Sequence, residues 1–179
     1  MPPEPVPSPW RAFLAELNAH VAQAVELHCI GGFVLSVLYG MPRPTAGVDV
    51  LSVVPRNQVE ALQSVAGQGS PLHRKHGVYL HHVAVASLPE DYEERLIEIF
   101  PSKYKRLRLF GVEAYDLALS KLERNASRDR EDVKYLARSV PLNLEVLERR
   151  YRTELRPYLA APERHDLTMQ LWREAIAAG

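Results

Sequence analysis

The chain has 179 residues, with 22 basic and 22 acidic side chains, so its formal net charge is zero with neutral histidine. This balance excludes whole-molecule attraction to nucleic acid or anionic membranes as the main source of affinity. One cysteine, Cys29, excludes an internal disulfide and a cysteine-built zinc site. No apolar run approaches the about 18 to 20 residues that span a bilayer, and residues 1–10 lack a signal-peptide pattern. We therefore expect a cytoplasmic protein with no membrane partner.

The N-terminal part predicts a helix followed by a strand. Residues 1–8 are rich in proline, and we expect them to be disordered or in a polyproline II conformation. Ser8-Pro9 is typical of a helix start, and apolar residues at helical spacing predict a helix over 9–23. The apolar run 25–30 predicts a buried strand that ends in a tight Gly31-Gly32 turn, and a short helix should follow over 33–40.

The middle of the chain alternates between predicted strands and helices. The β-branched run 48–54 is the clearest strand, and a helix capped by Asn57 should follow it. Four further segments complete this part: a flexible polar loop over 67–77, a strand over 78–86, a charged helix over 89–100, and a short strand over 106–110.

From residue 115 onward the pattern is helical throughout. We expect a first helix capped by Asp116, and then helices at 129–138, 143–159 and 164–177. Strands mixed with helices and followed by helices alone favour an α+β fold, in which a mixed sheet flanked by helices precedes a C-terminal helical bundle. The predicted organisation is a disordered 1–8, an α/β core over 9–112 and a helical region over 113–179.

The segment from Gly31-Gly32 to Asp49 is the first candidate for a functional site. A Gly-Gly turn lets backbone N–H groups approach an anion closely, and the N-terminus of the next helix favours negative charge. Asp49 could hold a divalent metal ion through its carboxylate oxygens. The alternative is that the glycines only form a tight turn and that Asp49 borders it.

A second constellation lies in the helical part. Asp129 and Asp132 are three residues apart and share one helical face, and Lys121 could meet them across a helix–helix turn. A lysine can bind a nucleotide phosphate as a point charge, and nearby carboxylates can orient it or act as bases. The alternative is a solvated pair of helices with ordinary surface salt bridges.

The remaining histidines, the cysteine and the basic run are weaker candidates for a functional site. Adjacent strand residues point to opposite faces, so His81 and His82 should not bind one ion, and His28 in a buried strand should be a satisfied core residue. We expect no nucleophilic role for Cys29. The basic run 103–108, with Tyr104 inside it, could contact a phosphate backbone or stack a base, or could be a charged edge strand.

Together these segments resemble the nucleotidyltransferases of the AbiEii/MenT toxin family, and more closely the small bacterial nucleotidyltransferase-like domains of unknown function. The resemblance spans roughly residues 28–160 and rests on Gly31-Gly32, Asp49, the 115–121 segment YDLALSK and the 128–132 segment RDRED. It implies the fold of the DNA polymerase β-type nucleotidyltransferases. It also implies roles for single residues: Gly31, Gly32 and Thr45 would bind nucleotide, Asp49 would hold Mg²⁺, Lys121 would contact phosphate, and Asp132 with Asp129 would position Lys121 or act as base.

The chain departs from the family pattern at two places. The Asp-x-Asp pair of the family would require acidic residues at 47 and 49, but position 47 is Gly47. The strand over 78–86 also has no carboxylate for a third metal ligand; the nearest acids are Glu90, Asp91, Glu93 and Glu94.

The resemblance implies a nucleotidyltransferase that transfers a nucleotide from NTP–Mg²⁺ to an acceptor such as tRNA, as a toxin with a cognate antitoxin protein. The alternative is a catalytically degenerate relative that binds a nucleotide or a partner protein.

Overall fold

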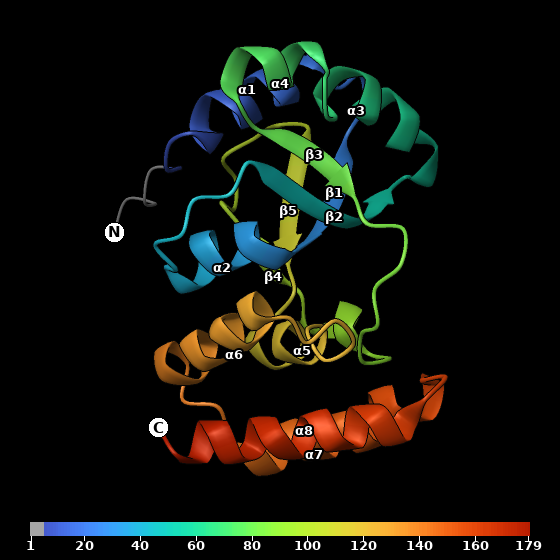
Figure 1. Ribbon diagram of the computed structural model, residues 1–179. Coiled ribbons are helices and arrows are strands. Elements are labelled where there is room, and N and C mark those ends of the chain that lie inside the picture. Colours follow the sequence, from blue (N-terminus) through green and yellow to red (C-terminus); the bar gives the residue numbers. More distant parts are fainter. Residues whose placement is uncertain (1–5) are drawn as a thin grey trace. The chain divides into compact units, whose positions relative to one another are not determined.

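The computed structural model describes residues 6–179 and confirms the predicted α+β fold (Figure 1). The described chain divides into two compact units. The sheet unit comprises the residues up to Val85 together with Leu96–Gly111, and the helical unit comprises Ala86–Arg95 and Val112–Gly179. The predicted disorder of residues 1–8 falls largely on residues 1–5, which lie outside the described residues; Val6 is buried.

Five strands form one mixed sheet within residues 6–179, in the order β3-β2-β1-β5-β4. Their bounds are β1 Val25–Ile30, β2 Gly47–Val54, β3 Tyr79–His82, β4 Ile97–Ile99 and β5 Leu107–Gly111. The β1–β5 and β2–β3 pairs are parallel, whereas β1–β2 and β4–β5 are antiparallel. The central strand β1 is largely buried, although its sequence alternates the apolar residues Val25, Leu27 and Cys29 with Glu26 and His28.

The helices of the sheet unit pack on this sheet. Helices α1, α3 and α4 contact one another beside the sheet, and α2 packs on β1 and β2 (Figure 1). The bounds are α1 Trp10–His20, α2 Gly31–Tyr39, the 3-10 helix η1 Arg56–Gln58, α3 Val59–Ala66 and α4 Pro71–His76. The largest fully buried side chains of this unit come from α1, β1, α2 and β5: Phe13, Leu14, Leu17, Leu27, Phe33, Leu35, Leu107 and Leu109.

The helical unit is built from short helices around a leucine core. Its elements are the 3-10 helix η2 Tyr92–Arg95, α5 Ala114–Leu119, α6 Ser127–Ser139, α7 Leu144–Arg150, the π-helical turn η3 Tyr151–Leu155, the 3-10 helix η4 Arg156–Tyr158 and α8 Pro162–Ala177. Leu117, Leu119, Leu136 and Leu147 are its largest fully buried side chains. Asn143 caps α7, because its side chain accepts hydrogen bonds from the backbone N–H groups of Glu145 and Val146.

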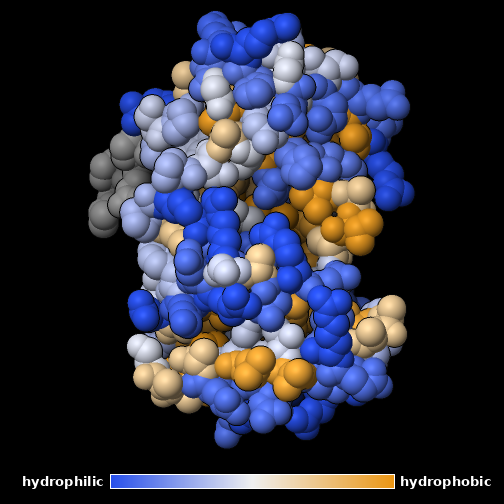
Figure 2. All heavy atoms as spheres, in the orientation of Figure 1, coloured by the Kyte–Doolittle hydropathy of each residue, from blue (hydrophilic) through white to orange (hydrophobic). Residues whose placement is uncertain are grey.

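The surface is mostly hydrophilic on the face drawn in Figure 2, where hydrophobic residues gather in small patches. The large hydrophobic side chains that remain exposed include Val85, Leu167 and Leu171. No helix among the described residues has both the length and the apolar character that crossing a membrane would require.

Two predicted segments are wrong. The predicted loop over 67–77 contains helix α4, because Ser70 caps it, Pro71 occupies its first turn and Gly77 ends it in the left-handed conformation. The predicted charged helix over 89–100 is instead η2 followed by strand β4, because the alternating residues 97–99 pair with β5.

Smaller details also differ from the prediction. Asn57 lies inside η1 and does not cap α3. The strand predicted over 78–86 is only β3, which ends at His82. Glu113, not Asp116, caps helix α5, because the Glu113 side chain accepts the backbone N–H of Asp116. No separate turn precedes α2, since the helix begins at Gly31 itself.

Candidate nucleotide and metal site

Gly31 begins α2 directly after β1, in a backbone conformation that only glycine adopts easily. Its φ is 76°, in the left-handed region. A β-carbon at this position would lie 2.5 Å from Oδ2 of Asp49, closer than two such atoms can approach. Glycine at position 31 therefore allows the backbone at the start of α2 to pass directly beside the Asp49 carboxylate.

Gly32 and Thr45 meet beside this point. A β-carbon on Gly32 would lie 3.5 Å from Thr45 Cβ and Oγ1, in ordinary contact. The Thr45 hydroxyl donates a hydrogen bond of 3.2 Å to the backbone oxygen of Gly47. The structure thus brings together all four sheet-unit residues of the predicted site, Gly31, Gly32, Thr45 and Asp49. Because a helix N-terminus presents free backbone N–H groups, this place is suited to an anion such as a phosphate.

The Asp49 carboxylate has a partner that the sequence analysis did not assign to this site. The parallel register of β2 and β3 sets His81 opposite Asp49, and His81 Nδ1 lies 2.9 Å from Asp49 Oδ1. The side chain of Asp49 is 33% exposed and that of His81 is 60% exposed. The alternation of β3 sends His81 and His82 to opposite faces, but the β2–β3 register that brings His81 to Asp49 has no local signal in the sequence.

Position 47 lacks the first carboxylate that an Asp-x-Asp pair would supply, but it has room for a β-carbon. A β-carbon on Gly47 would lie 3.6 Å from Tyr79 Oη and 3.8 Å from Asp49 Oδ1, both ordinary van der Waals contacts. The nearby donors are therefore one carboxylate and one imidazole. Among the residues that the structure describes, no group of three or more His, Cys, Asp or Glu side chains is arranged to hold a metal ion.

The helical-unit residues of the predicted site form a buried ion-pair cluster. Lys121 Nζ lies 2.9 Å from Asp132 Oδ2 and 3.7 Å from Asp129 Oδ1, as the helix–helix geometry predicted. Both aspartates are almost completely buried, and the Lys121 side chain is only 11% exposed. The alternative of a solvated surface pair is therefore wrong for these three residues, because their charged groups are largely removed from water.

Arg124 and the start of α6 complete this cluster. The guanidinium of Arg124 binds Asp129 through two hydrogen bonds of 2.7 and 2.6 Å, and the backbone N–H of Ala126 donates to Asp129 Oδ2. Burial disfavours the charged form of Asp129, but these hydrogen bonds and the nearby Lys121 charge outweigh it and lower its pKa. Asp129 thus stays ionised and fixes the turn that leads into α6.

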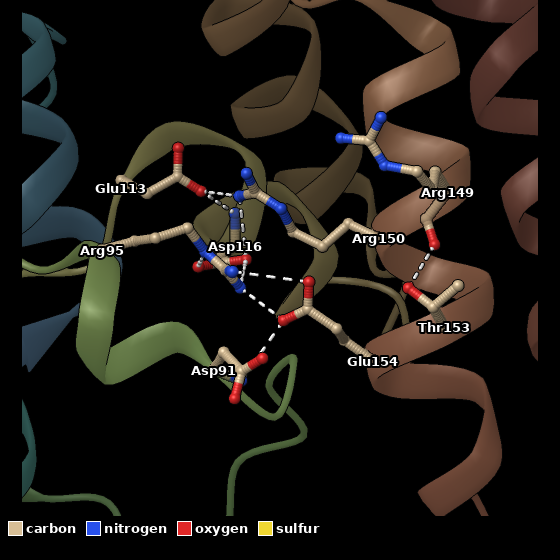
Figure 3. Close-up of polar contacts among 8 residues, drawn as sticks. All are labelled: Asp91, Arg95, Glu113, Asp116, Arg149, Arg150, Thr153 and Glu154. Carbon is tan, nitrogen blue, oxygen red and sulfur yellow. Dashed lines mark hydrogen bonds and ion pairs between the residues drawn. The ribbon is translucent and has the colours of Figure 1, made fainter.

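Asp116, which lies in the 115–121 segment that carries part of the resemblance, belongs to a second buried cluster (Figure 3). Asp116 is fully buried and accepts hydrogen bonds of 2.8 and 3.1 Å from Arg95 and one of 3.1 Å from Arg150. Arg95 also binds Glu154, and Arg150 also pairs with Glu113. The sequence analysis did not predict this cluster, because its members lie up to 59 residues apart in the chain.

One family model matches nearly the whole chain: a model described as a nucleotidyltransferase of unknown function (DUF6036) matches residues 12–177. The chain belongs to this family. No curated protein matches the chain, and no solved structure does. Membership of DUF6036 makes the chain nucleotidyltransferase-like. Nucleotidyltransferases generally use a divalent metal ion with an NTP substrate, which gives the four clustered residues around α2 a chemical context.

In this DUF6036 chain the basic run 103–108 is partly engaged in structural contacts. The alternative of an edge strand is wrong, because β5 lies between β1 and β4. Arg108 pairs with Glu98 and Glu26, and Arg106 donates to the backbone oxygen of Val21. Lys103 and Lys105 are exposed. The two lysines are therefore the part of this run best placed to contact a phosphate backbone.

His28 and Cys29 are both buried, as predicted. Nδ1 of His28, however, has no hydrogen-bond partner among the described residues, so the expectation of a fully satisfied side chain is wrong. Burial, together with the charge of Asp49, raises the pKa of the Cys29 thiol well above its usual range. That shift disfavours the thiolate, which a nucleophilic cysteine needs.

Proposed function

We propose that this chain is a nucleotidyltransferase of the AbiEii/MenT kind, which transfers a nucleotide from an NTP to tRNA and acts as a toxin countered by an antitoxin protein. The observation that supports the proposal most is the meeting of Gly31, Gly32, Thr45 and Asp49 at the start of α2. A helix start lined by glycines, next to a carboxylate, combines an anion site with a cation ligand.

Each residue of the candidate site has its own role in the proposed reaction. The backbone at Gly31 and Gly32 binds phosphate oxygens, and Thr45 holds the segment that faces Gly32. Asp49 is the protein ligand of the divalent ion, whose charge would neutralise the phosphates when it is bound. The acceptor hydroxyl attacks the α-phosphorus, the bond to the β-phosphate oxygen breaks, and pyrophosphate leaves. Such a transfer depends mainly on positioning and on charge neutralisation.

Lys121, Asp132 and Asp129 have roles that the resemblance implies. We assign the neutralisation of the triphosphate to Lys121, and the positioning of its ammonium group to Asp132 and Asp129. The hydrogen bond of 2.9 Å between Lys121 and Asp132 supports the positioning role. The resemblance implies that Asp132, more than Asp129, would accept the proton of the acceptor hydroxyl.

A second function is favoured by one specific observation, the glycine at position 47. With a single carboxylate, Mg²⁺ would have fewer protein ligands than the paired carboxylates of the family provide. A chain that keeps the anion site but has lost this ligand would bind a nucleotide or a partner protein without catalysing transfer.

One set of variants separates the two functions. Untagged wild type, Gly47→Asp and Asp49→Asn are incubated with labelled NTPs, Mg²⁺ and total tRNA, and binding of Mg–ATP and Mg–CTP is measured by calorimetry. The proposed function requires label transfer by the wild type and its loss in Asp49→Asn. Transfer by Gly47→Asp alone would favour the degenerate relative. If neither NTP binds to any of the three proteins, the transferase function is wrong, and the degenerate relative could only be one that binds a partner protein.

A further inference from the structure

We propose that His81 is a second protein ligand of the divalent cation at Asp49, and that the site therefore takes a first-row transition ion in preference to Mg²⁺. This inference deepens the proposed function and rests on it for the purpose of the cation. It concerns the two places at which the chain departs from the AbiEii/MenT pattern. Gly47 supplies no carboxylate, and neither does any residue of β3.

The first support is the placement of His81. Asp49 and His81 lie opposite each other on adjacent parallel strands, so their side chains leave the sheet on the same face. The regular backbone of two paired strands, rather than a loop, sets their separation. A ligand pair on rigid elements is held more precisely than one on loops.

The second support is the distance between the two donor atoms. His81 Nδ1 and Asp49 Oδ1 are 2.9 Å apart. Two neighbouring ligands that bind one octahedral ion at about 2.1 Å, at a right angle, lie about 3.0 Å apart. The pair therefore has the spacing of cis ligands without any movement of the strands. The second carboxylate oxygen, Oδ2, points towards Gly31.

The third support is the space around the pair. Asp49 and His81 are both partly exposed, at 33% and 60% of their side chains. The glycine at position 47 puts no side chain beside Asp49 Oδ1. Water molecules and phosphate oxygens can therefore complete the coordination of an ion that has only two protein ligands.

The chemistry of the two donor atoms, a carboxylate oxygen and an imidazole nitrogen, determines which cation the site prefers. Mg²⁺ is a hard cation that binds oxygen ligands and gains little from an imidazole. Affinity for a site with a nitrogen donor rises along the first transition row, so Co²⁺ should bind more tightly than Mn²⁺. A carboxylate with an imidazole thus favours Co²⁺ and Mn²⁺ over Mg²⁺, whereas two carboxylates would suit Mg²⁺.

The competing explanation is that the His81–Asp49 pair only links β2 to β3. The two explanations differ in what His81→Gln does to metal binding. Untagged, metal-free protein without NTP is titrated with Mg²⁺, Mn²⁺ and Co²⁺ by calorimetry, and free Mn²⁺ is followed by electron paramagnetic resonance. His82→Gln is the matched control, because His82 lies on the same strand and faces the other way.

The expected result is graded. The wild type should bind Co²⁺ more tightly than Mn²⁺, and Mn²⁺ more tightly than Mg²⁺. His81→Gln should weaken Co²⁺ binding roughly tenfold, weaken Mn²⁺ binding less, and leave Mg²⁺ binding unchanged. His81→Asp should narrow the difference in affinity between Co²⁺ and Mg²⁺, because a carboxylate suits Mg²⁺ better than an imidazole does. Substoichiometric Mn²⁺ should broaden the imidazole NMR signals of His81 but leave those of His82 sharper.

Three outcomes would overturn the inference: equal affinity of the wild type for all three ions, unchanged Co²⁺ binding in His81→Gln, or equal loss in His81→Gln and His82→Gln. Because the metal titrations contain no NTP, they test the inference about the cation site separately from the proposed function. A chain that binds Co²⁺ through His81 but binds no NTP would contradict the function alone. A chain that transfers nucleotide while His81→Gln keeps its metal affinities would contradict the inference alone.

Discussion

The backbone of Gly31 passes so close to Asp49 that a β-carbon at position 31 would lie 2.5 Å from the carboxylate oxygen Oδ2. This contact joins the first residue of α2 to the candidate metal ligand on β2. Because neither partner lies in a loop, a change at one of them must displace the other.

Gly31→Ala should destabilise the chain and move Asp49. The left-handed backbone at position 31 costs a non-glycine residue about 1 to 2 kcal/mol, and the collision with Asp49 adds to this cost. Gly32→Ala is the control, since its β-carbon would make ordinary contacts and alanine favours a helix. Urea unfolding should show a clear loss for Gly31→Ala and none for Gly32→Ala. Equal stability of the two variants would contradict the described geometry.

Lys121→Met should lower the free energy of unfolding by about 3 kcal/mol, because it leaves buried carboxylates without their ammonium partner. Lys134→Met on α6 is the matched control; Lys134 is exposed, and its loss should change stability by no more than about 0.5 kcal/mol. Chemical denaturation of both variants checks this prediction. A stability loss in Lys121→Met no larger than that in Lys134→Met would argue against a buried ion pair.

Truncation of Arg150 should lower the stability of the chain more than truncation of the adjacent Arg149. Arg150→Ala removes a hydrogen bond to the fully buried Asp116 and an ion pair with Glu113, so we expect a loss of about 2 kcal/mol. Arg149→Ala, on the same helix, removes an exposed side chain that lies outside this cluster (Figure 3). Thermal or urea unfolding should therefore separate the two variants, and similar curves would contradict the cluster.

Asp166 should make the free energy of unfolding of the chain depend on pH in the acid range. Hydrogen bonds from Arg156 and Tyr151 lower the pKa of Asp166 to about 2, whereas an unfolded aspartate titrates near about 4. A lowered pKa means that the stabilising contribution is fully present above pH of about 4 and is lost as the pH falls towards about 2. Asp166→Asn should thus be less stable than the wild type at neutral pH, and the difference should shrink over this range.

Unfolding free energies measured across the acid range test this pH dependence. Arg156→Gln provides a second variant, because it removes the hydrogen bonds that lower the pKa most. Stability profiles of wild type and Asp166→Asn that remain parallel down to pH of about 2 would contradict the prediction.

Much of the fold was predictable from local sequence patterns. Strands β1 and β2 form as predicted, because apolar and β-branched side chains fit a pleated and largely buried surface. Helix α4 also had a local signal in Ser70-Pro71 and Gly77, but its polar composition obscured it. Strand β4 had none of sufficient strength, because three residues become a strand only through pairing with β5.

Some contacts of the candidate site could be predicted from local sequence patterns, and others could not. Lys121 and Asp132 could be expected to meet, since helical spacing and a short connection determine their approach. The contact of His81 with Asp49 required the β2–β3 register, which no local pattern specifies. The Arg95–Asp116 and Arg95–Glu154 ion pairs could not be predicted either, because they depend on how segments 21 and 59 residues apart fold together.

Residues 86–95 carry a consequence for any attempt to divide the gene. They precede β4 and β5 in the chain, yet Arg95 and the backbone of Glu90 bind Asp116 and Glu154, which come after both strands. An open reading frame ending at residue 111 would encode every strand and still leave Arg95 without its carboxylates. A single cut in the chain therefore yields no pair of fragments that each contain a whole unit. Two such fragments, expressed as separate polypeptides, should not fold independently of each other.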